Sequence, residues 1–489
     1  MMFFCQTFLF RKKYVPLQTE NMVAMKKTGA LFCLYLVFPF FASAQIAGIW
    51  EGKLPVGSDS LRLVLAMEQH GDSLFAEMDS PDQYAAVIEV NSISFQHDTL
   101  RLKSRSVGAA FQGVYNIENE EINGIFKQGG TRLPLKLHRV TERWKLNRLQ
   151  TPKEPFPYET EEVKLQFPHA TLGQIPITGT LSYPSRKHEF NNKLLILVSG
   201  SGWQDRDESI MGHKPFAVIA DYLTRRGYAV FRYDDFPPVL YARCTTLDFA
   251  DAASYIVDYY KLKNVHFKQA KVGILGHSEG GTIAVMVAAK NKHVDFIISM
   301  AGMMAPAKAT LLYQIDALYQ YDTTLSPAEK TESVRISEAL YTTIEQAKSV
   351  KEASERCGKL LRDYSAGMSM EQQHKLKMTQ QDIFITLRNI GSPWFYELFR
   401  LNQPKYLKKV KCPVLALNGK KDVQVEWESN FAIMEQNLPK KTSLTTHAYE
   451  QVNHLFQPCE TGLPTEYGQI ETTIFEEVLR DIENWLGER

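Results

Sequence analysis

The chain has 489 residues, of which 44% are hydrophobic, and its formal net charge at pH 7 is +1. This length provides enough apolar material for two or more domains, each with its own core. The 56 basic residues are balanced by 55 acidic ones, so the chain lacks the excess positive charge typical of nucleic-acid-binding proteins. We therefore expect no nucleic-acid partner.

The N-terminal 44 residues have the features of a secretory signal region. A charged start at Met25–Lys27 is followed by an apolar run, Leu31–Phe41, and by small residues up to Ala44. This order is typical of a cleaved signal peptide. We expect the signal peptide to occupy residues 25–44, and the secreted or periplasmic mature protein to begin at Gln45. The apolar run is too short for a stable membrane span, and no cysteine follows the cleavage site to carry a lipid.

The cysteines give no sign of a metal site. Cys5 and Cys33 fall in the predicted signal region, which leaves the scattered Cys244, Cys357, Cys412 and Cys459. Their spacing does not match that of metal ligands, and a chain of this size needs no disulfides for stability. We expect four unpaired, mostly buried thiols, with a Cys412–Cys459 disulfide as the alternative.

Residues 45–140 have the pattern of a small all-β domain, either a sandwich or a barrel. Short β runs recur with polar or glycine-containing turns between them. The clearest runs are Leu61–Leu65, Leu74–Met78, Thr99–Leu102 and Leu133–Leu137. The domain has no cluster of His, Asp and Glu and no phosphate-binding loop, so we expect a scaffold or a substrate-orienting role rather than glycan or lipid binding. Trp50 and Tyr84 suit a core and a ligand platform equally well.

A proline-rich linker, residues 141–162, precedes a second domain at 163–489. Strands and helices alternate in this domain, which indicates an α/β fold with a parallel sheet and right-handed crossovers. The predicted elements are the hairpin Val163–Phe167 and Ile175–Tyr183, the strand Leu194–Val198, the helix Pro215–Arg226, the strand Tyr228–Tyr233, the helix Thr246–Lys261 and the strand Val294–Met300.

A further strand begins at Lys271 and ends in the sequence Gly276-His277-Ser278-Glu279-Gly280-Gly281, after which an apolar, alanine-rich run follows. Strand, sharp turn and helix in this order form a nucleophile elbow, in which only small residues fit beside the central serine. We therefore expect Ser278 to be a nucleophile. The backbone N–H of Glu279, at the start of the helix, can then stabilise an oxyanion.

The loop after Leu194–Val198 is rich in Gly and Ser, and it is expected to supply a second oxyanion N–H from Ser201 or its neighbour Gly202. The same loop continues into Asp205–Asp207. We expect these charged residues mainly to form ion pairs that fix the loop, with direct substrate contact as the alternative.

From about residue 306 to residue 400, charged and apolar residues recur at helical spacing. The strongest helical runs are Leu311–Tyr321, Pro327–Cys357 and Met370–Leu387. We expect a helical cap that covers the site and shapes its pocket. A helical surface excursion without substrate contact is the alternative.

The sheet resumes at Cys412–Asn418, and Asp422 lies in the loop that follows. A carboxylate after a late strand is where a catalytic acid belongs, because it accepts a hydrogen bond from the imidazole of the base and fixes its tautomer. Glu426 and Glu428 are weaker candidates, since they suit the start of the next helix.

His454 is the candidate base, because it follows the predicted last strand, Thr445–Tyr449, in a loop before a terminal helix, Glu466–Leu486. His447 lies inside that strand and is expected to pack. His277 occupies the variable position of the elbow and points beside the nucleophile. The chain order Ser278, Asp422, His454 is the order that an α/β-hydrolase requires.

Together these motifs resemble those of secreted bacterial α/β-hydrolases of the serine-esterase type, related to dienelactone hydrolases and to the catalytic domains of prolyl oligopeptidases. The resemblance covers about Val163 to Trp485. It rests on Gly200–Gly202 with Asp205–Asp207, on Gly276–Gly281, on Leu417–Gly419 with Asp422, and on Asn453–Phe456. The β domain in front also resembles a module found ahead of such hydrolases.

One segment departs from this family. Its members commonly have an Arg-Gly-rich turn after the equivalent of Tyr233-Asp234, whereas this chain has Asp235–Pro238. That loop borders the site, so the departure bears on substrate range more than on catalysis.

The sequence thus predicts a serine hydrolase that cleaves small-molecule carboxylic esters through an acyl-enzyme, with no metal or organic cofactor. Three alternatives stay open. An amino- or oligopeptidase would use the same residues and would need an acidic or aromatic clamp for a peptide terminus. An acyltransferase or thioesterase would differ only in the acyl donor or acceptor. A non-catalytic binding protein would lack one of the three catalytic residues.

Overall fold

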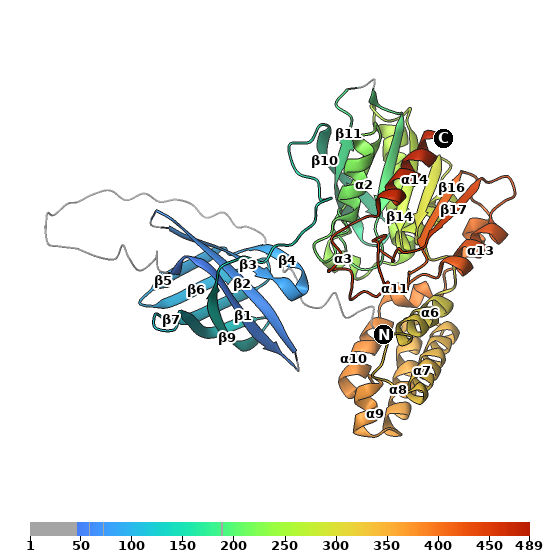
Figure 1. Cartoon of the computed structure of the whole chain (residues 1–489). Coiled ribbons are helices and arrows are strands. Elements are labelled where there is room, and N and C mark those ends of the chain that lie inside the picture. The colour runs from blue at the N-terminus through green and yellow to red at the C-terminus, as the bar shows by residue number, and fades with distance from the viewer. Residues whose placement is uncertain (1–45, 58, 72, 187–188) are drawn as a thin grey trace. The chain divides into compact units, whose positions relative to one another are not determined.

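The computed structural model describes residues 46–57, 59–71, 73–186 and 189–489, in which the chain forms two compact units that divide at Arg148 (Figure 1). The predicted signal region, residues 1–44, and its cleavage site before Gln45 lie outside the described residues. Within the described ranges, no helix is both long and apolar enough to cross a membrane.

The first unit is a single antiparallel sheet of nine strands in the order β4-β3-β2-β1-β9-β8-β7-β6-β5. Each of the four clearest β runs falls within one of its strands. The strands are β1 (Gly48–Val56), β2 (Asp59–His70), β3 (Ser73–Ser80), β4 (Ala85–Glu89), β5 (Ser92–Gln96), β6 (Thr99–Ser104), β7 (Ala109–Asn116), β8 (Glu121–Gln128) and β9 (Thr131–Val140). A short 3₁₀ turn, Pro81–Gln83, precedes β4.

This sheet curls around one core. Strands β3 and β5 are far apart in the strand order and still contact each other, so the unit is one curled sheet and not two stacked ones. Trp50 is fully buried in the core, and its indole Nε1–H donates to the carbonyl oxygen of Ile46 at 2.9 Å. Trp50 is therefore a core residue, whereas Tyr84 is partly exposed.

The second unit contains an eight-stranded sheet in the order β10-β11-β13-β12-β14-β15-β16-β17. The hairpin β10–β11 joins β13 antiparallel, and the remaining neighbours are parallel. The strands are β10 (Glu159–His169), β11 (Gly173–Tyr183), β12 (Lys193–Val198), β13 (Ala229–Tyr233), β14 (Lys271–His277), β15 (Phe296–Met300), β16 (Val414–Gly419) and β17 (Leu444–Tyr449). The carboxyl ends of β12 and β14–β17 therefore meet at one edge of the sheet.

Helices cover both faces of this sheet. One face packs against α4, α5, α12 and α13, and the other against α2 and α14. These helices are α2 (Pro215–Thr224), α4 (Thr246–Asp258), α5 (Glu279–Ala288), α12 (Gln403–Leu407), α13 (Trp427–Asn437) and α14 (Glu476–Gly487). A π-helical turn, Tyr259–Lys263, extends α4, and the short α3 (Pro238–Tyr241) lies in the loop after β13.

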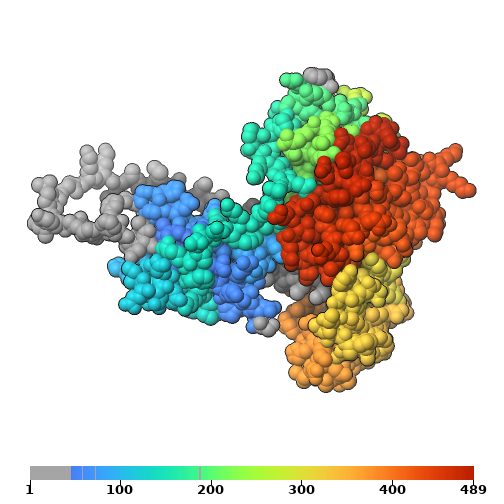
Figure 2. All heavy atoms as spheres, in the orientation of Figure 1, coloured from blue at the N-terminus to red at the C-terminus, as the bar shows by residue number. Residues whose placement is uncertain are grey.

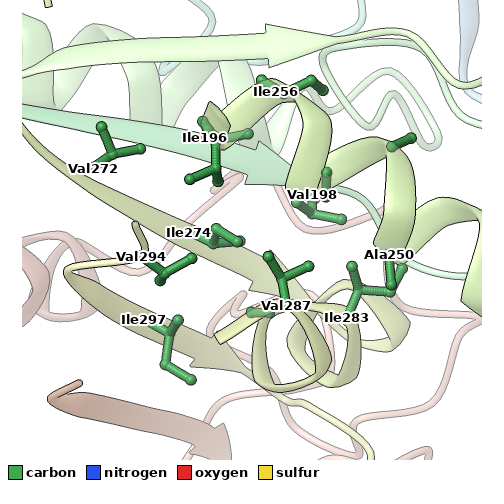
Figure 3. Close-up of a cluster of buried hydrophobic side chains, with 14 of the residues drawn as sticks. Ile196, Val198, Ala250, Ile256, Val272, Ile274, Ile283, Val287, Val294 and Ile297 are labelled. Carbon is green, nitrogen blue, oxygen red and sulfur yellow. The ribbon is translucent and has the colours of Figure 1, made fainter. Parts of the chain in front are cut away.

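Figure 3 shows the first of these interfaces, in which branched side chains from neighbouring strands face α4 and α5. Ile196, Ile274 and Ile297 come from three adjacent strands, and each is fully buried. Because buried parallel strands are covered on both faces, they read as continuous apolar runs. Those runs are what made these strands predictable from the sequence.

The helices of residues 307–398 form a lobe that projects from the sheet, in yellow and orange in Figure 2. They are α6 (Ala307–Tyr319), α7 (Pro327–Gln346), α8 (Val350–Ala366), α9 (Met370–Lys375), α10 (Gln380–Ile390) and α11 (Pro393–Leu398). The predicted helical insertion is present, but two of its predicted runs are each divided into two helices.

Polar caps cause both divisions. Ser349 accepts from the backbone N–H of Glu352 at 3.1 Å, which begins a new helix inside the predicted run 327–357. In the same way, Thr379 and Asp382 form a capping box that begins α10 inside the predicted run 370–387. A side chain that satisfies the free N–H groups of a helix start competes with continuation of the preceding helix.

The terminal helix begins later than predicted, at Glu476 instead of Glu466. The side-chain oxygen of Gln150 accepts from the backbone N–H groups of Thr473 and Ile474, at 2.7 and 2.9 Å. Tyr467 is fully buried in the same segment. A residue more than three hundred positions away therefore supplies partners that a helix would otherwise provide, which local periodicity does not reveal.

The four cysteines of the described chain, Cys244, Cys357, Cys412 and Cys459, are free thiols. This confirms the prediction of unpaired cysteines and does not support the Cys412–Cys459 alternative. Burial raises the pKa of the Cys244 and Cys459 thiols to about 11, so both are protonated and unreactive near neutral pH.

Truncation of a buried strand residue is expected to destabilise the second unit. Ile274→Ala removes three buried carbons from the middle of β14, and such a change costs about 2–5 kcal/mol of unfolding free energy. Ile385→Ala on α10 is the control, because Ile385 is exposed and its loss should cost less than about 0.5 kcal/mol. Urea unfolding followed by tryptophan fluorescence measures both, and equal losses would contradict the packing shown here.

Candidate active site

Ser278 occupies a sharp turn between β14 and α5, with a φ of +54°. This is the left-handed region, which costs a non-glycine residue strain energy and is typical of functional turns. A Cβ on Gly276 would collide with the carbonyl oxygen of Gly280, and one on Gly280 would collide with that of Val198. The turn therefore requires glycine at both positions, as the sequence predicts.

Asp422 and His454 lie in direct contact in the loops that follow β16 and β17. The Nδ1 atom of His454 is 2.8 Å from Oδ2 of Asp422, and both side chains are buried. Because the carboxylate accepts at Nδ1, the Nε2 atom of the imidazole is left to act as a base. Figure 1 shows β16 and β17, the strands that these loops follow, at one side of the sheet.

The carboxylate of Asp422 is fixed by its own loop. Its Oδ1 atom accepts from the backbone N–H groups of Gln424 and Val425, at 2.7 and 2.9 Å. The cap also contacts this loop, because the hydroxyl of Tyr313 on α6 donates to the backbone carbonyl of Asp422 at 2.7 Å. These contacts orient the carboxylate toward His454 with little freedom.

His277 connects the elbow to the loop of His454. It directly precedes Ser278, its Nε2 atom is 2.9 Å from the backbone carbonyl oxygen of His454, and the two imidazole rings lie 4.9 Å apart between centroids. The loop of His454, with its partner Asp422, therefore contacts the residue next to Ser278. The hydroxyl of Ser278 has no hydrogen-bond partner among the described residues. Hydrogen bonds between catalytic side chains are often long or poorly aligned until substrate binds.

The loop after β12 lies against the nucleophile. A Cβ on Gly200 would be 3.1 Å from the Cβ of Ser278, so the predicted oxyanion residues Ser201 and Gly202 follow directly after a close approach to the serine. Gly202 has a φ of +95°, which needs glycine at the bend.

Ion pairs fix the remainder of this loop. Arg206 contacts Asp234 at 2.6 Å and Glu162 at 2.5 Å, and Asp207 contacts Arg232 and Lys214. These contacts agree with the loop-fixing role predicted for the charged residues.

Two carboxyl groups line a pocket beside the serine. Glu279 accepts from Thr246 Oγ1 at 2.6 Å and from the indole Nε1–H of Trp394, on the cap helix α11, at 2.8 Å. Asp235 accepts from the backbone N–H of Gln204 at 2.7 Å. Burial raises the pKa of both carboxyl groups. The other residues of the pocket are Val198, Ser199, Gly200, Tyr233, Phe236, Tyr241, Phe249, Ala252 and Ile283.

The weaker candidates lie elsewhere. Glu426 precedes α13 and Glu428 lies in its first turn, where a carboxylate stabilises the helix N-terminus. His447 stacks on Tyr449, with centroids 4.2 Å apart, and its Nδ1 atom is 2.9 Å from Asp481 on α14.

Two groups of side chains in the described residues are close enough to hold a metal ion: His169, Cys244 and Asp248, and His447, Glu477 and Asp481. In the first group, the Nδ1 atom of His169 accepts from backbone N–H groups, and Asp248 belongs to the capping box of α4. In the second, Asp481 accepts from the hydroxyl of Tyr449. Local hydrogen bonds thus account for both groups.

A protein-family model described as "Serine aminopeptidase, S33" matches residues 213–457, which is half of the chain. The chain belongs to this hydrolase family. The match includes Ser278, Asp422 and His454, and with the sheet order it confirms the predicted α/β-hydrolase fold and the prediction of a serine hydrolase.

Named proteins are similar to parts of this chain. Esterase EstD of Thermotoga maritima is 25% identical over 317 residues, which cover 63% of this chain and 66% of that protein. Human acyl-coenzyme A thioesterase 1 is 26% identical over 145 residues, 29% of this chain and 31% of that protein. The chain thus spans just under two thirds of EstD and about a third of the thioesterase.

Solved structures with a similar fold include the esterase Pf2001 of Pyrococcus furiosus, which is 14% identical with a TM-score of 0.39, over 72% of this chain and 95% of that one. A dienelactone hydrolase of Anabaena variabilis is 15% identical with a TM-score of 0.36, over 67% and 98%.

Sequence reasoning missed two features of this site. Glu208 is buried beside His277, and Trp394 reaches Glu279 from the cap. Glu208 lies only two residues beyond Arg206 in a charged loop, and a fourth charged residue next to a known motif is a signal that could have marked it. Trp394 gave no such signal, because nothing in its spacing relates it to the elbow.

Proposed function

We propose that this protein is a serine esterase that hydrolyses small-molecule carboxylic esters through a covalent acyl-enzyme. The observation that carries the proposal is that His277, which directly precedes Ser278 on its strained turn, contacts the loop of His454, whose imidazole is paired with the buried Asp422. Family membership supports it, as does the similarity to a protein named as an esterase.

In the proposed mechanism, Nε2 of His454 takes the proton of the Ser278 hydroxyl, and the serine oxygen attacks the ester carbonyl carbon. The backbone N–H groups of Glu279 and of Ser201 or Gly202 donate to the resulting oxyanion. His454 returns its proton to the leaving alcohol, and the carbonyl re-forms as an acyl-enzyme. Water, deprotonated by His454, then releases the acid. Asp422 stabilises the imidazolium formed at each step.

A peptidase is the second candidate, because the pocket beside the serine contains the carboxyl groups of Asp235 and Glu279. Either could accept from the ammonium group of a peptide N-terminus, and the family is described as one of serine aminopeptidases. Their partners in the protein, Gln204, Thr246 and Trp394, already satisfy part of their hydrogen-bonding capacity. This occupation favours the esterase.

Purified protein should hydrolyse p-nitrophenyl esters, and Ser278→Ala should lower kcat by about 10⁴–10⁶ while the fold is retained. The reason is that the alanine has no oxygen to attack the carbonyl. Steady-state rates and circular dichroism check both parts. Ser209→Ala is the matched control, because Ser209 is exposed in the loop after β12 and has no role in the proposed mechanism.

The same rates with aminoacyl anilides and acyl-coenzyme A separate the esterase from a peptidase and from a thioesterase. A higher kcat/KM with an aminoacyl anilide than with any ester would replace the esterase by the peptidase. Retained ester turnover by Ser278→Ala would reject Ser278 as nucleophile. A phosphonate that labels another serine would do the same.

Asp422→Asn should lower kcat by up to about 10⁴, because an amide in this position favours the wrong imidazole tautomer. Glu426→Gln is the matched control, since Glu426 has the same charge, lies four residues away and makes no contact with His454 among the described hydrogen bonds. Rates with the best ester measure both variants. Loss of activity in Glu426→Gln with near-full activity in Asp422→Asn would show that the acid is misassigned.

We also propose that the protein is exported, with the mature chain starting at Gln45. The charged, apolar and small-residue segments of residues 25–44 support this. Expression of the full chain in a bacterium, followed by N-terminal sequencing of the periplasmic and secreted fractions, should find Gln45 first. A cytoplasmic protein that retains the residues before Met25 would contradict export.

A further inference from the structure

The side chains of Glu208 and His277 are both buried next to the candidate site, and neither has a role in the mechanism above. The Nδ1 atom of His277 is 2.9 Å from Oε1 of Glu208, and its Nε2 atom is 2.9 Å from the backbone carbonyl oxygen of His454. A backbone carbonyl can only accept. A carboxylate that also receives the backbone N–H of Gly200, at 2.7 Å on the same oxygen, is an acceptor as well.

With Glu208 ionised, both ring nitrogens of His277 face acceptors, an arrangement that favours a proton on each. Burial alone would lower the pKa of His277, but the charge and hydrogen bond of Glu208 outweigh it, and the pKa is raised. The geometry and the direction of this shift both favour an imidazolium at His277, paired with a buried carboxylate. The groups that face its ring are Glu208, the ring and carbonyl of His454, the more distant Asp422, and Phe456.

This pair joins three parts of the site. Glu208 accepts from Gly200, in the loop of the proposed oxyanion donors, and His277 donates to the loop of the proposed base. His277 itself directly precedes Ser278. We propose that Glu208 and His277 are positioning residues, a buried carboxylate–imidazolium pair that sets the oxyanion loop and the loop of His454 at the correct distance from Ser278. The catalytic part of this proposal rests on the proposed function.

Glu208→Gln is the sharpest test. One carboxylate oxygen accepts from both Gly200 and His277, and without the negative charge the buried His277 loses one proton. In the glutamine, the group at this position is either the NH₂, which can donate to Nδ1 of His277, or the oxygen, which can accept from the N–H of Gly200. It cannot do both, so one of the two hydrogen bonds is lost. We expect kcat to fall by about 10–100-fold with KM little changed, because displacement of about 1 Å at a catalytic group has effects of this size.

The pH profile gives a readout that a purely structural role would not move. The pKa of His277 in the folded protein is raised above the ordinary value of about 6.5. The pair therefore positions the two loops fully below pH 6.5, and this positioning is lost as the pH rises through the raised pKa. The wild type should therefore lose kcat on an alkaline limb. In Glu208→Gln this limb should move at least one pH unit lower, whereas in Glu208→Asp, which keeps the charge, it should stay close to its wild-type position.

Asp258→Asn is the matched control. Asp258 lies 2.8 Å from Nδ1 of His293, in a partly exposed carboxylate–histidine pair that makes no hydrogen bond to the site residues in the part of the chain that the structure describes. Its loss should leave both kcat and the alkaline limb unchanged. An unchanged limb and kcat in Glu208→Gln would overturn the proposal.

A second measurement needs no substrate. In the resting protein labelled with ¹⁵N-histidine, both ring nitrogens of His277 should remain protonated at pH 7.5, with the resonance assigned by its absence in His277→Gln. A neutral ring at that pH would overturn the imidazolium even if Glu208→Gln failed to fold. Should the wild type neither hydrolyse esters nor react with a phosphonate at Ser278, the proposed function fails, while this spectrum still decides the charge of the pair.

Discussion

The site depends on a steric constraint at the end of β14. The chain must reverse from strand to helix within one residue, and it does so only because Gly276 and Gly280 have no side chains to collide with the backbone. Two consequences follow from the same turn. The start of α5 comes close enough to β12 to lie against the loop of Gly200, and Ser278 is held at a positive φ with its side chain at the edge of the sheet. Ser278 keeps this strained backbone conformation because the surrounding strands and α5 hold the turn in place.

Around this turn the protein buries several ionisable side chains close together, and each has hydrogen-bond partners. His454 is paired with Asp422, and His277 is paired with Glu208. Asp235 and Glu279 have only neutral donors, and the pKa of each is raised. Removal of one partner from a buried pair costs more than the pair contributes, because the remaining charge is left uncompensated. The site is therefore sensitive to single substitutions even where the substituted residue does not touch substrate.

Much of this arrangement could be predicted from the sequence, because the relevant signals are local. The apolar runs of buried strands, the small residues around Ser278, and the loops that place Asp422 and His454 after late strands are all readable within about ten residues. The topology then brings these loops together, since carboxyl ends of parallel strands share one edge.

What could not be predicted depends on partners far apart in sequence. Glu208 and His277 are 69 residues apart, and Gln150 contacts a segment more than 300 residues away. The chain around Glu208 and Gln150 fits an ordinary loop, and His277 occupies the variable position of the elbow. Even the local errors have this origin in part. Ser349 is a residue type that favours the start of a helix. Whether the preceding helix ends there also depends on how the surrounding side chains pack, and the local sequence does not show this packing.

The cap makes direct contact with the site, because it contacts both the nucleophile and the acid segments. Tyr313 on α6 donates to the carbonyl of Asp422, and Trp394 on α11 donates to the carboxyl group of Glu279. The backbone N–H of Glu279 is a proposed oxyanion donor. The residue whose side chain binds the cap is therefore also a residue of the proposed oxyanion hole. If α11 moved away, the buried carboxyl group would lose a donor, at a cost of about 1–3 kcal/mol. Movement of α11 away from Glu279 is therefore opposed unless a polar group of the substrate or water replaces the indole as donor.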